Sequence, residues 1–136
     1  MPQIAVALDL GTSGFRAQAL DLETGEALST AITTRHPLPG ANVIDHLHFA
    51  IEMDIERAGD IVVEAVDRVI KALRVDPGDV ARLAVCGNPI QLSLFQRMEI
   101  RDLAFAGKRK LESLGVVQQN RDAHVLPASS IAGLPI

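Results

Sequence analysis

The residues best suited to chemistry stand near the start of the chain, and they are Asp9, Gly11, Thr12, Ser13 and Gly14. Glycine adopts backbone conformations that a Cβ resists, and it lets a ligand come close to the chain. Successive N–H groups in such a turn can hold an anion, and the hydroxyls of Thr12 and Ser13 add donors. Asp9 offers a carboxylate to a hydrated magnesium ion, which keeps several of its waters. The pattern indicates a phosphate-binding turn, with an ordinary Gly-Thr-Ser-Gly hairpin as the alternative.

Two strands must position this turn. Apolar residues alternate with smaller ones at Ile4, Val6 and Leu8, and residues 15–22 resume an extended, mostly apolar pattern. A short polar turn then leads to a third strand, which is expected over residues 26–34. We therefore expect an antiparallel meander of three strands, with the glycines at its first reversal.

Helices and a fourth strand are expected after the meander. From about Met53 to Leu73, apolar residues recur at steps of three and four, which is the stripe of an amphipathic helix lying on a sheet. Asp76 and Pro77 then form a helix-start signature, as N-cap and first helical residue. Residues 81–86 predict a buried strand, joined to the sheet by a right-handed crossover and parallel to a neighbour. A last helix is expected over residues 102–114.

Gly87 and Asn88 form a second candidate constellation, between the fourth strand and a helix expected over residues 90–98. Asn88 is suited to cap this helix and Pro89 to open it, which is a purely structural role. Open α/β sheets, however, bind ligands at the carboxyl ends of their strands, and helix N-termini present N–H groups to anions. We therefore add Gly87 and Asn88 to the candidate ligand-binding residues. Gln91 is either a substrate contact or a surface residue.

The run Asp9-Leu10-Gly11-Thr12-Ser13 between two strands resembles the first phosphate motif of the superfamily that unites actin, heat-shock chaperone ATPases, hexokinase and other sugar kinases. The expected order strand, strand, strand, helix, strand is that of its first subdomain. The resemblance implies an α/β, ribonuclease H-like, actin-type subdomain, in which a mixed sheet is flanked by helices. It also implies ATP and Mg as cofactors, with Asp9 contacting the metal through water.

Three further segments narrow the resemblance to reductive activators of corrinoid-dependent methyltransferases and to the group called methanogenesis marker protein 14. Residues 85–91 resemble the Gly-Asn-Thr-Thr segment of the activators, residues 40–44 resemble their Gly-Glu-Asp-Val-Ile stretch, and residues 124–133 resemble their Val-Leu-Pro…Ala-Gly strand. The chain departs from the pattern at Ser13 and Pro89, where the activators carry Thr. The resemblance implies a corrinoid protein or another metalloenzyme as client.

In this superfamily the nucleotide lies between two lobes, and the sequence offers a motif for only the first. We find no second loop of the Asp-x-Gly-Gly type in residues 1–136. We therefore expect a single N-terminal ATPase-like lobe, a fragment that needs a C-terminal lobe or a partner subunit for tight ATP and Mg binding and for any ATPase or phosphotransferase activity. No catalytic residue is identified. An isolated lobe would leave an apolar face uncovered, which predicts a homodimer.

Two other functions stay open at this point. One is a non-catalytic assembly or dimerisation module that has kept the actin-like fold. The other is the N-terminal half of a sugar kinase, which ranks lower because Asn88 stands where a substrate hydroxyl would need a carboxylate base.

Composition argues against several further classes. A net charge of -4 and 3% aromatic residues disfavour nucleic acid as a partner. We find neither a basic-then-apolar leader nor an apolar run long enough for a bilayer, so we expect a cytoplasmic protein and no membrane contact. The single cysteine, Cys86, is expected to be a small buried hydrophobe. Asp45, His46 and His48 are metal-type ligands close together, but a polar loop or helix edge is the preferred interpretation.

Overall fold

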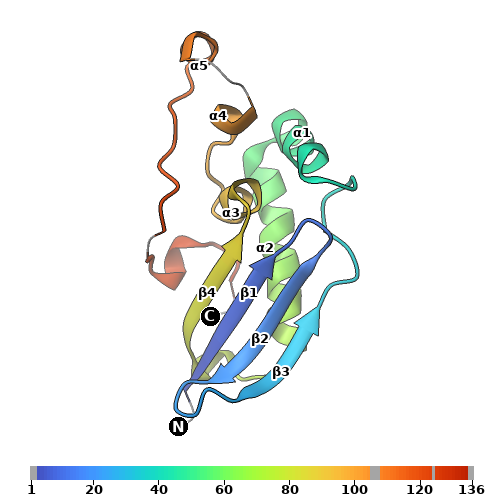
Figure 1. The fold of residues 1–136 in the computed structure, drawn as a ribbon, viewed down its shortest axis with the longest axis vertical. Coiled ribbons are helices and arrows are strands. Elements are labelled where there is room, and N and C mark those ends of the chain that lie inside the picture. Colours follow the sequence, from blue (N-terminus) through green and yellow to red (C-terminus); the bar gives the residue numbers. More distant parts are fainter. Residues whose placement is uncertain (1–2, 105–107, 124, 135–136) are drawn as a thin grey trace.

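The computed structural model describes residues 3–104, 108–123 and 125–134. Its centre is a four-stranded sheet in the order β3-β2-β1-β4, and α2 runs along one face of this sheet (Figure 1). The elements are β1 (Ile4–Leu10), β2 (Phe15–Asp21), β3 (Ala27–Ile32), α1 (Val43–Met53), α2 (Ile55–Ala72), β4 (Val80–Gly87), α3 (Pro89–Phe95), α4 (Arg101–Ala104) and α5 (Lys108–Leu114). The predicted mixed α/β sheet is confirmed.

The first three strands form the predicted antiparallel meander. β1 pairs with β2 from Ile4 opposite Asp21 to Leu10 opposite Phe15, and β2 pairs with β3. Side chains alternate between the two faces of a strand, and the face of β1 toward the helices is buried. Its buried residues are Ile4, Val6, Leu8 and Leu10. The turn at residues 11–14 therefore joins two strands that are held in place by a closely packed core.

The helical region differs from the prediction of one helix over residues 53–73. The chain forms two helices, α1 and α2, on either side of Asp54, and α1 was not predicted. Asp54 has φ 153°, outside the helical region, and serves both as C-cap of α1 and as N-cap of α2. α2 packs its apolar stripe on the sheet as predicted, and its buried residues include Ala58, Val62, Ala65, Val66, Val69 and Ile70.

β4 joins the sheet parallel to β1, as predicted, after a short helical turn at Pro77–Asp79 that Asp76 caps. It is not a buried strand, however, because it lies at an edge of the sheet and, after the buried Val80, its residues are partly buried or exposed. The prediction of a buried Cys86 is wrong for the same reason. Cys86 is paired with Asp9 on the face of the sheet opposite α2, and it is exposed.

The later helices are shorter than predicted. α3 begins at Pro89 and ends at Phe95, and Arg97 then takes φ 55°, which does not continue a helix. The helix expected over residues 102–114 is represented by α4 and α5, with residues 105–107 outside the described part. No helix within the described ranges is long and apolar enough to cross a membrane.

The segment at residues 124–133, which resembles the Val-Leu-Pro…Ala-Gly strand of the activators, forms no strand in its described part. Residues 125–127 have no regular secondary structure, and Ala128–Ser130 form a single 3-10 turn. Pro127 has no N–H to give to a strand ladder, which disfavours a strand at this point. His124 lies outside the described residues.

Candidate phosphate-binding site

The turn between β1 and β2 is a tight hairpin with free backbone donors. Gly11 N–H donates to the Gly14 carbonyl at 3.1 Å, which leaves Thr12 and Ser13 at the tip. Within the described residues, no hydrogen bond uses the backbone N–H groups of Thr12, Ser13 or Gly14. Successive unbonded N–H groups in a turn are the donors that an anion needs.

Both glycines of the turn are required by the packing of the hairpin itself. A Cβ on Gly11 would lie 2.8 Å from the Gly14 carbonyl oxygen, and a Cβ on Gly14 would lie 2.7 Å from Thr33 Oγ1. Thr33 Oγ1 also accepts a hydrogen bond from Phe15 N–H at 2.7 Å. Backbone freedom and ligand approach were the predicted reasons for these glycines, and close packing within the turn is a further, sufficient reason for them.

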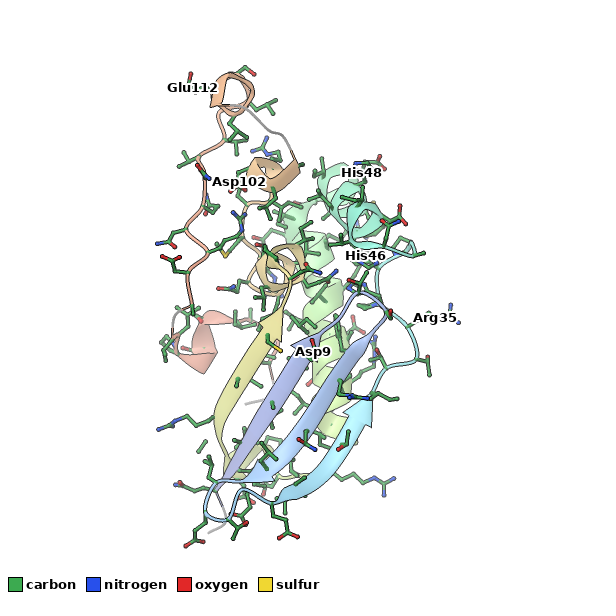
Figure 2. All side chains as sticks on the ribbon, in the orientation of Figure 1. Asp9, Arg35, His46, His48, Asp102 and Glu112 are labelled. Atoms are coloured by element: carbon green, nitrogen blue, oxygen red, sulfur yellow. The ribbon has the colours of Figure 1, made fainter. Side chains whose placement is uncertain are left out.

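Asp9 lies at the base of the hairpin, on the open face of the sheet (Figure 2). It is exposed and stands opposite Arg16 of β2 and Cys86 of β4 in the strand register. Partial burial and the nearby Asp9 carboxylate raise the pKa of the Cys86 thiol. Asp9 is therefore not part of the apolar core, and its predicted contact with magnesium through water stays compatible with its position.

The end of β4 meets the same hairpin. Gly87 is paired with Leu10, and a Cβ on Gly87 would lie 2.9 Å from the Leu10 carbonyl oxygen. Asn88 Oδ1 accepts a hydrogen bond from Gln91 N–H at 3.0 Å, so Asn88 is the N-cap of α3, and its Nδ2 lies 3.5 Å from Thr12 Oγ1. The structure thus brings Asn88 to the turn at residues 11–14, while phosphate binding there and a ligand contact of Gly87 or Asn88 stay predictions.

A buried polar network behind the hairpin was missed by the sequence analysis. His36 Nε2 and Gln91 Oε1 are 2.6 Å apart, and Gln91 Nε2 and His46 Nδ1 are 2.9 Å apart. The two imidazole rings stack with centroids 3.8 Å apart. All three side chains are buried, so Gln91 is not a surface residue. His46 belongs to this network, and in the described residues no three metal-type side chains are placed so that they could hold one metal ion.

Hydrogen-bond directions assign the protons of both rings. Leu38 N–H donates to His36 Nδ1 at 3.0 Å, so His36 carries its proton on Nε2 and donates it to Gln91 Oε1. The Gln91 amide then donates to His46 Nδ1, which places the His46 proton on Nε2. That Nε2 is buried and forms no hydrogen bond of good geometry within the described part of the chain, although His46 also interacts with the Gly40 backbone. Both histidines are therefore neutral.

Burial favours the neutral form of each histidine. Burial lowers the pKa of His36 to about 4. The hydrogen bond with Gln91 acts in the opposite direction, and the charge of a protonated His46 would lower this pKa further. Burial also lowers the pKa of His46, although the Gly40 backbone and the Asp45 carboxylate act in the opposite direction. At neutral pH the network holds no net charge.

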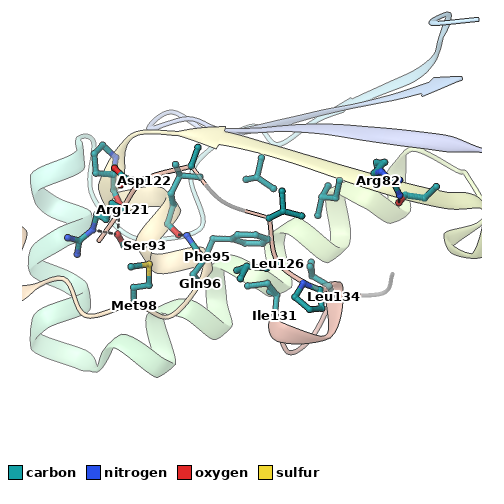
Figure 3. A pocket seen from close by; sticks show the side chains of 18 residues that line it. Arg82, Ser93, Phe95, Gln96, Met98, Arg121, Asp122, Leu126, Ile131 and Leu134 are labelled. Atoms are coloured by element: carbon teal, nitrogen blue, oxygen red, sulfur yellow. Dashed lines mark hydrogen bonds between the residues drawn. The ribbon is translucent and has the colours of Figure 1, made fainter. Parts of the chain in front are cut away.

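A separate cavity of about 650 Å³ lies along β4 and was not predicted (Figure 3). Its lining is mainly apolar and comes from β4, α3 and the segment after α5, including Leu83, Val85, Leu92, Phe95, Leu126 and Ile131. Arg121 lies at one end, where it donates to Ser93 Oγ at 2.8 Å and forms an ion pair with Asp102 at 2.5 Å. Its lining residues come from segments that are far apart in sequence, so no local sequence motif could have predicted this cavity.

The meander, the crossover helix and the parallel fourth strand define an actin-type, ribonuclease H-like α/β subdomain. A solved structure of a reductive activator for corrinoid, iron-sulfur protein has the same fold, with a TM-score of 0.65 and 20% identity over 79% of this chain and 19% of that one. The model of the RACo middle region matches residues 4–124, so the chain belongs to the RACo middle region family.

A relative of known name is much closer in sequence. It is the reductase of the Co(II) methylated amine-specific corrinoid protein from Methanosarcina barkeri, which is 58% identical over 128 residues. The match takes in 94% of this chain and 24% of that protein, so the chain spans about a quarter of the relative's length. The predicted resemblance to reductive activators of corrinoid proteins is confirmed.

Proposed function

We propose that the turn at residues 11–14 binds the phosphate groups of Mg-ATP, and that the chain is the ATP-binding lobe of a protein that reactivates a corrinoid protein. The observation that carries the proposal is the row of unbonded N–H groups at Thr12, Ser13 and Gly14. Such a row can hold an anion without any side-chain charge. Membership in the RACo middle region family and the corrinoid protein reductase at 58% identity support the corrinoid client.

The residues around the turn fit a magnesium ion bound with the nucleotide. Asp9 is exposed at the base of the hairpin, where a carboxylate can accept hydrogen bonds from the waters of a hydrated ion. The ion, when bound, would neutralise part of the phosphate charge. Thr12 Oγ1 and Asn88 Nδ2, which are 3.5 Å apart, place a hydroxyl and an amide at the side of the same turn.

The remaining part of the nucleotide site belongs, in this proposal, to a C-terminal lobe or a partner subunit. The relative from Methanosarcina barkeri is about four times as long as the region that it shares with this chain. β4 has an unpaired edge within the described residues, and the apolar cavity lies beside it. Val125, which is 97% exposed, adds apolar surface next to this cavity. These features support a contact surface along β4.

The same surface favours self-association as the second candidate function. A non-catalytic assembly module would use the β4 edge to form a homodimer and would not bind Mg-ATP. Sedimentation of the chain with and without Mg-ATP separates the two functions. A dimer that is indifferent to Mg-ATP, with no nucleotide binding, would favour the assembly module over the ATP-binding lobe.

The phosphate site is tested by titrating the isotope-labelled chain with Mg-ATP up to millimolar concentration and following its backbone amide resonances. We expect the largest shifts at Gly11, Thr12, Ser13 and Gly14, and weaker magnesium-dependent binding for Asp9→Asn. Glu52→Gln removes an exposed carboxylate of α1 and should bind as the parent does. If the parent shows no shifts at the turn, the proposed function is wrong. If Asp9→Asn binds Mg-ATP as tightly as the parent, the role of Asp9 is wrong.

A further inference from the structure

We propose that Gln91, together with His36 and His46, is a positioning network that sets the conformation of the phosphate hairpin. The inference rests on the proposed function, because it assigns to these buried residues the task of holding the binding turn in shape. None of the three touches the phosphate in this account. They act through the two segments that flank the hairpin.

One connection runs through the second half of the turn. The His36 ring meets the Phe15 ring edge to face, with centroids 5.1 Å apart, and Phe15 directly follows Gly14. Thr33, three residues before His36, donates its N–H to the Phe15 carbonyl at 2.8 Å and accepts from Phe15 N–H through Oγ1. The segment that carries His36 therefore packs against the outgoing strand of the hairpin.

The other connection runs through the tip of the turn. Gln91 N–H donates to Asn88 Oδ1 at 3.0 Å, and the same Asn88 side chain places Nδ2 3.5 Å from Thr12 Oγ1. The side chain of Gln91 binds His36, while its backbone holds Asn88. Gln91 is consequently the residue at which the supports on both sides of the hairpin join.

The network has one hydrogen-bonding direction, which gives it a unique geometry. Because Leu38 N–H occupies His36 Nδ1, His36 must donate to the Gln91 oxygen, and the Gln91 amide must then donate to His46. A flipped Gln91 amide would set donor against donor at His36. Only one arrangement pairs a donor with an acceptor at both contacts of Gln91, and such a network specifies the positions of the segments that it joins. One of those segments contacts Phe15 through the His36 ring, and another carries Asn88.

Three variants of the full chain test this role. Gln91→Leu keeps a side chain of similar size but makes it apolar, which removes both hydrogen bonds to the histidines. Gln91→Glu keeps the oxygen that accepts from His36 but replaces the donating amide group with a second acceptor oxygen, so His46 must carry a proton on Nδ1 to bond with residue 91. Gln96→Leu is the matched control, because Gln96 lies at the C-terminal end of α3 and its amide donates to Leu92 O.

The first measurement is made without ligand. In Gln91→Leu we expect the amide resonances of Gly11–Gly14 to shift and the Gly11 amide to exchange faster with solvent, because its bond to Gly14 O opens more often. In Gln91→Glu we expect the imidazole nitrogen shifts of His46 to report the change of tautomer, a signature that a merely space-filling residue would not produce. Gln96→Leu should leave the turn and both imidazoles as in the parent.

The second measurement is the affinity for Mg-ATP. We expect Gln91→Leu to weaken binding about tenfold, Gln91→Glu to recover part of that loss, and Gln96→Leu to match the parent. If Gln91→Leu affects the turn no more than Gln96→Leu does, the positioning role is overturned. If the parent does not bind Mg-ATP, the proposed function fails, while the ligand-free resonances still decide the role of the network. If Gln91→Leu does not fold, the His46 tautomer and the turn resonances in Gln91→Glu decide it.

Discussion

α3 separates two buried polar clusters, and they differ in charge. On the hairpin side, Gln91 joins two neutral histidines. On the other side, Ser93 meets Arg121, which is paired with Asp102 at 2.5 Å and also donates to the Glu99 carbonyl at 2.6 Å. The neutral cluster joins segments around the candidate binding turn, and the charged cluster fastens the chain after α5 to α3 and α4.

This difference in charge determines which changes destabilise each cluster. A neutral network depends on hydrogen-bond direction, so it fails when a proton is added. A buried ion pair depends on both partners, so it fails when either charge is lost. Burial alone would raise the pKa of Asp102, but the hydrogen bonds from Arg121 and from Gln119 N–H outweigh it and lower that pKa. The two clusters should therefore respond to different changes.

A large loss of stability is expected from breaking the charged cluster. Asp102→Ala leaves the Arg121 guanidinium, 17% exposed, without its carboxylate, and we expect a loss of about 3 kcal/mol in the free energy of unfolding. Urea denaturation at neutral pH measures it. Glu64→Ala, which breaks an exposed pair with Arg68, should cost less than about 0.5 kcal/mol. Equal losses in the two variants would show that the buried pair has no special weight.

As the pH falls, the neutral cluster should lose stability before the charged cluster does. Unfolded histidine has a pKa of 6.5, whereas His36 has one of about 4, so the unfolded chain binds more protons between these values. Stability therefore falls as pH drops from about 6.5 and levels off near 4, by on the order of 3 kcal/mol for His36 alone. The lowering of the His46 pKa adds to this loss. Protonation of Asp102 lowers the stability only below pH 3.8, its ordinary pKa, because its pKa in the folded chain is lowered.

Urea midpoints measured across this pH range test that separation of the clusters. His36→Phe keeps a ring next to Phe15 but has no titrating group, so its stability should depend less on pH between about 6.5 and 4. His48→Gln removes an exposed histidine and should keep the pH dependence of the parent. A parent chain that is equally stable at both ends of the range would rule out neutral, buried histidines.

A substitution that disturbs the closed hairpin should reduce the free energy of unfolding less than a change in either cluster does. In Gly11→Ala the added Cβ would lie 2.8 Å from the Gly14 carbonyl oxygen, and relief of this contact should cost about 2 kcal/mol. Gly78→Ala is the control, since its Cβ would meet only the side chain of Asp76, at 3.3 Å. Thermal unfolding gives the stabilities, and titration gives Mg-ATP affinity. If Gly11→Ala loses no more stability than Gly78→Ala, ligand approach and not turn closure explains the glycine.

The features that the sequence could predict are those that depend on residues close together in the chain. The turn at Gly11–Gly14 and the cap at Asn88 are local patterns, and the structure has both. The histidine network joins residues 55 and 45 positions apart, so no window of sequence contains it. The burial of Cys86 was predicted wrongly because an apolar strand does not reveal which of its faces a helix will cover.

The smallest effect is expected on the open face of the sheet, where Asp9 and Cys86 are neighbours in the strand register. Alkylation of a cysteine requires the thiolate, and desolvation by neighbouring atoms together with the Asp9 carboxylate raises the pKa of the Cys86 thiol, although the side chain is exposed. We expect Asp9→Asn to increase the rate of Cys86 alkylation several-fold at mildly alkaline pH, because a neutral amide does not oppose the thiolate charge. The stability of the fold should change little, since both side chains are exposed.

Asp21→Asn provides the matched control for this rate. Asp21 ends β2 opposite Ile4, at the other end of the sheet, and the amide oxygen can still accept from Glu23 N–H. Its loss of charge should leave Cys86 alkylation unchanged, which separates a local effect of Asp9 from the effect of net charge. An equal rise in both variants would mean that Asp9 does not act on Cys86 through proximity. A rise confined to Asp9→Asn would place the Asp9 charge on the open face beside the hairpin, where the proposed magnesium ion requires it.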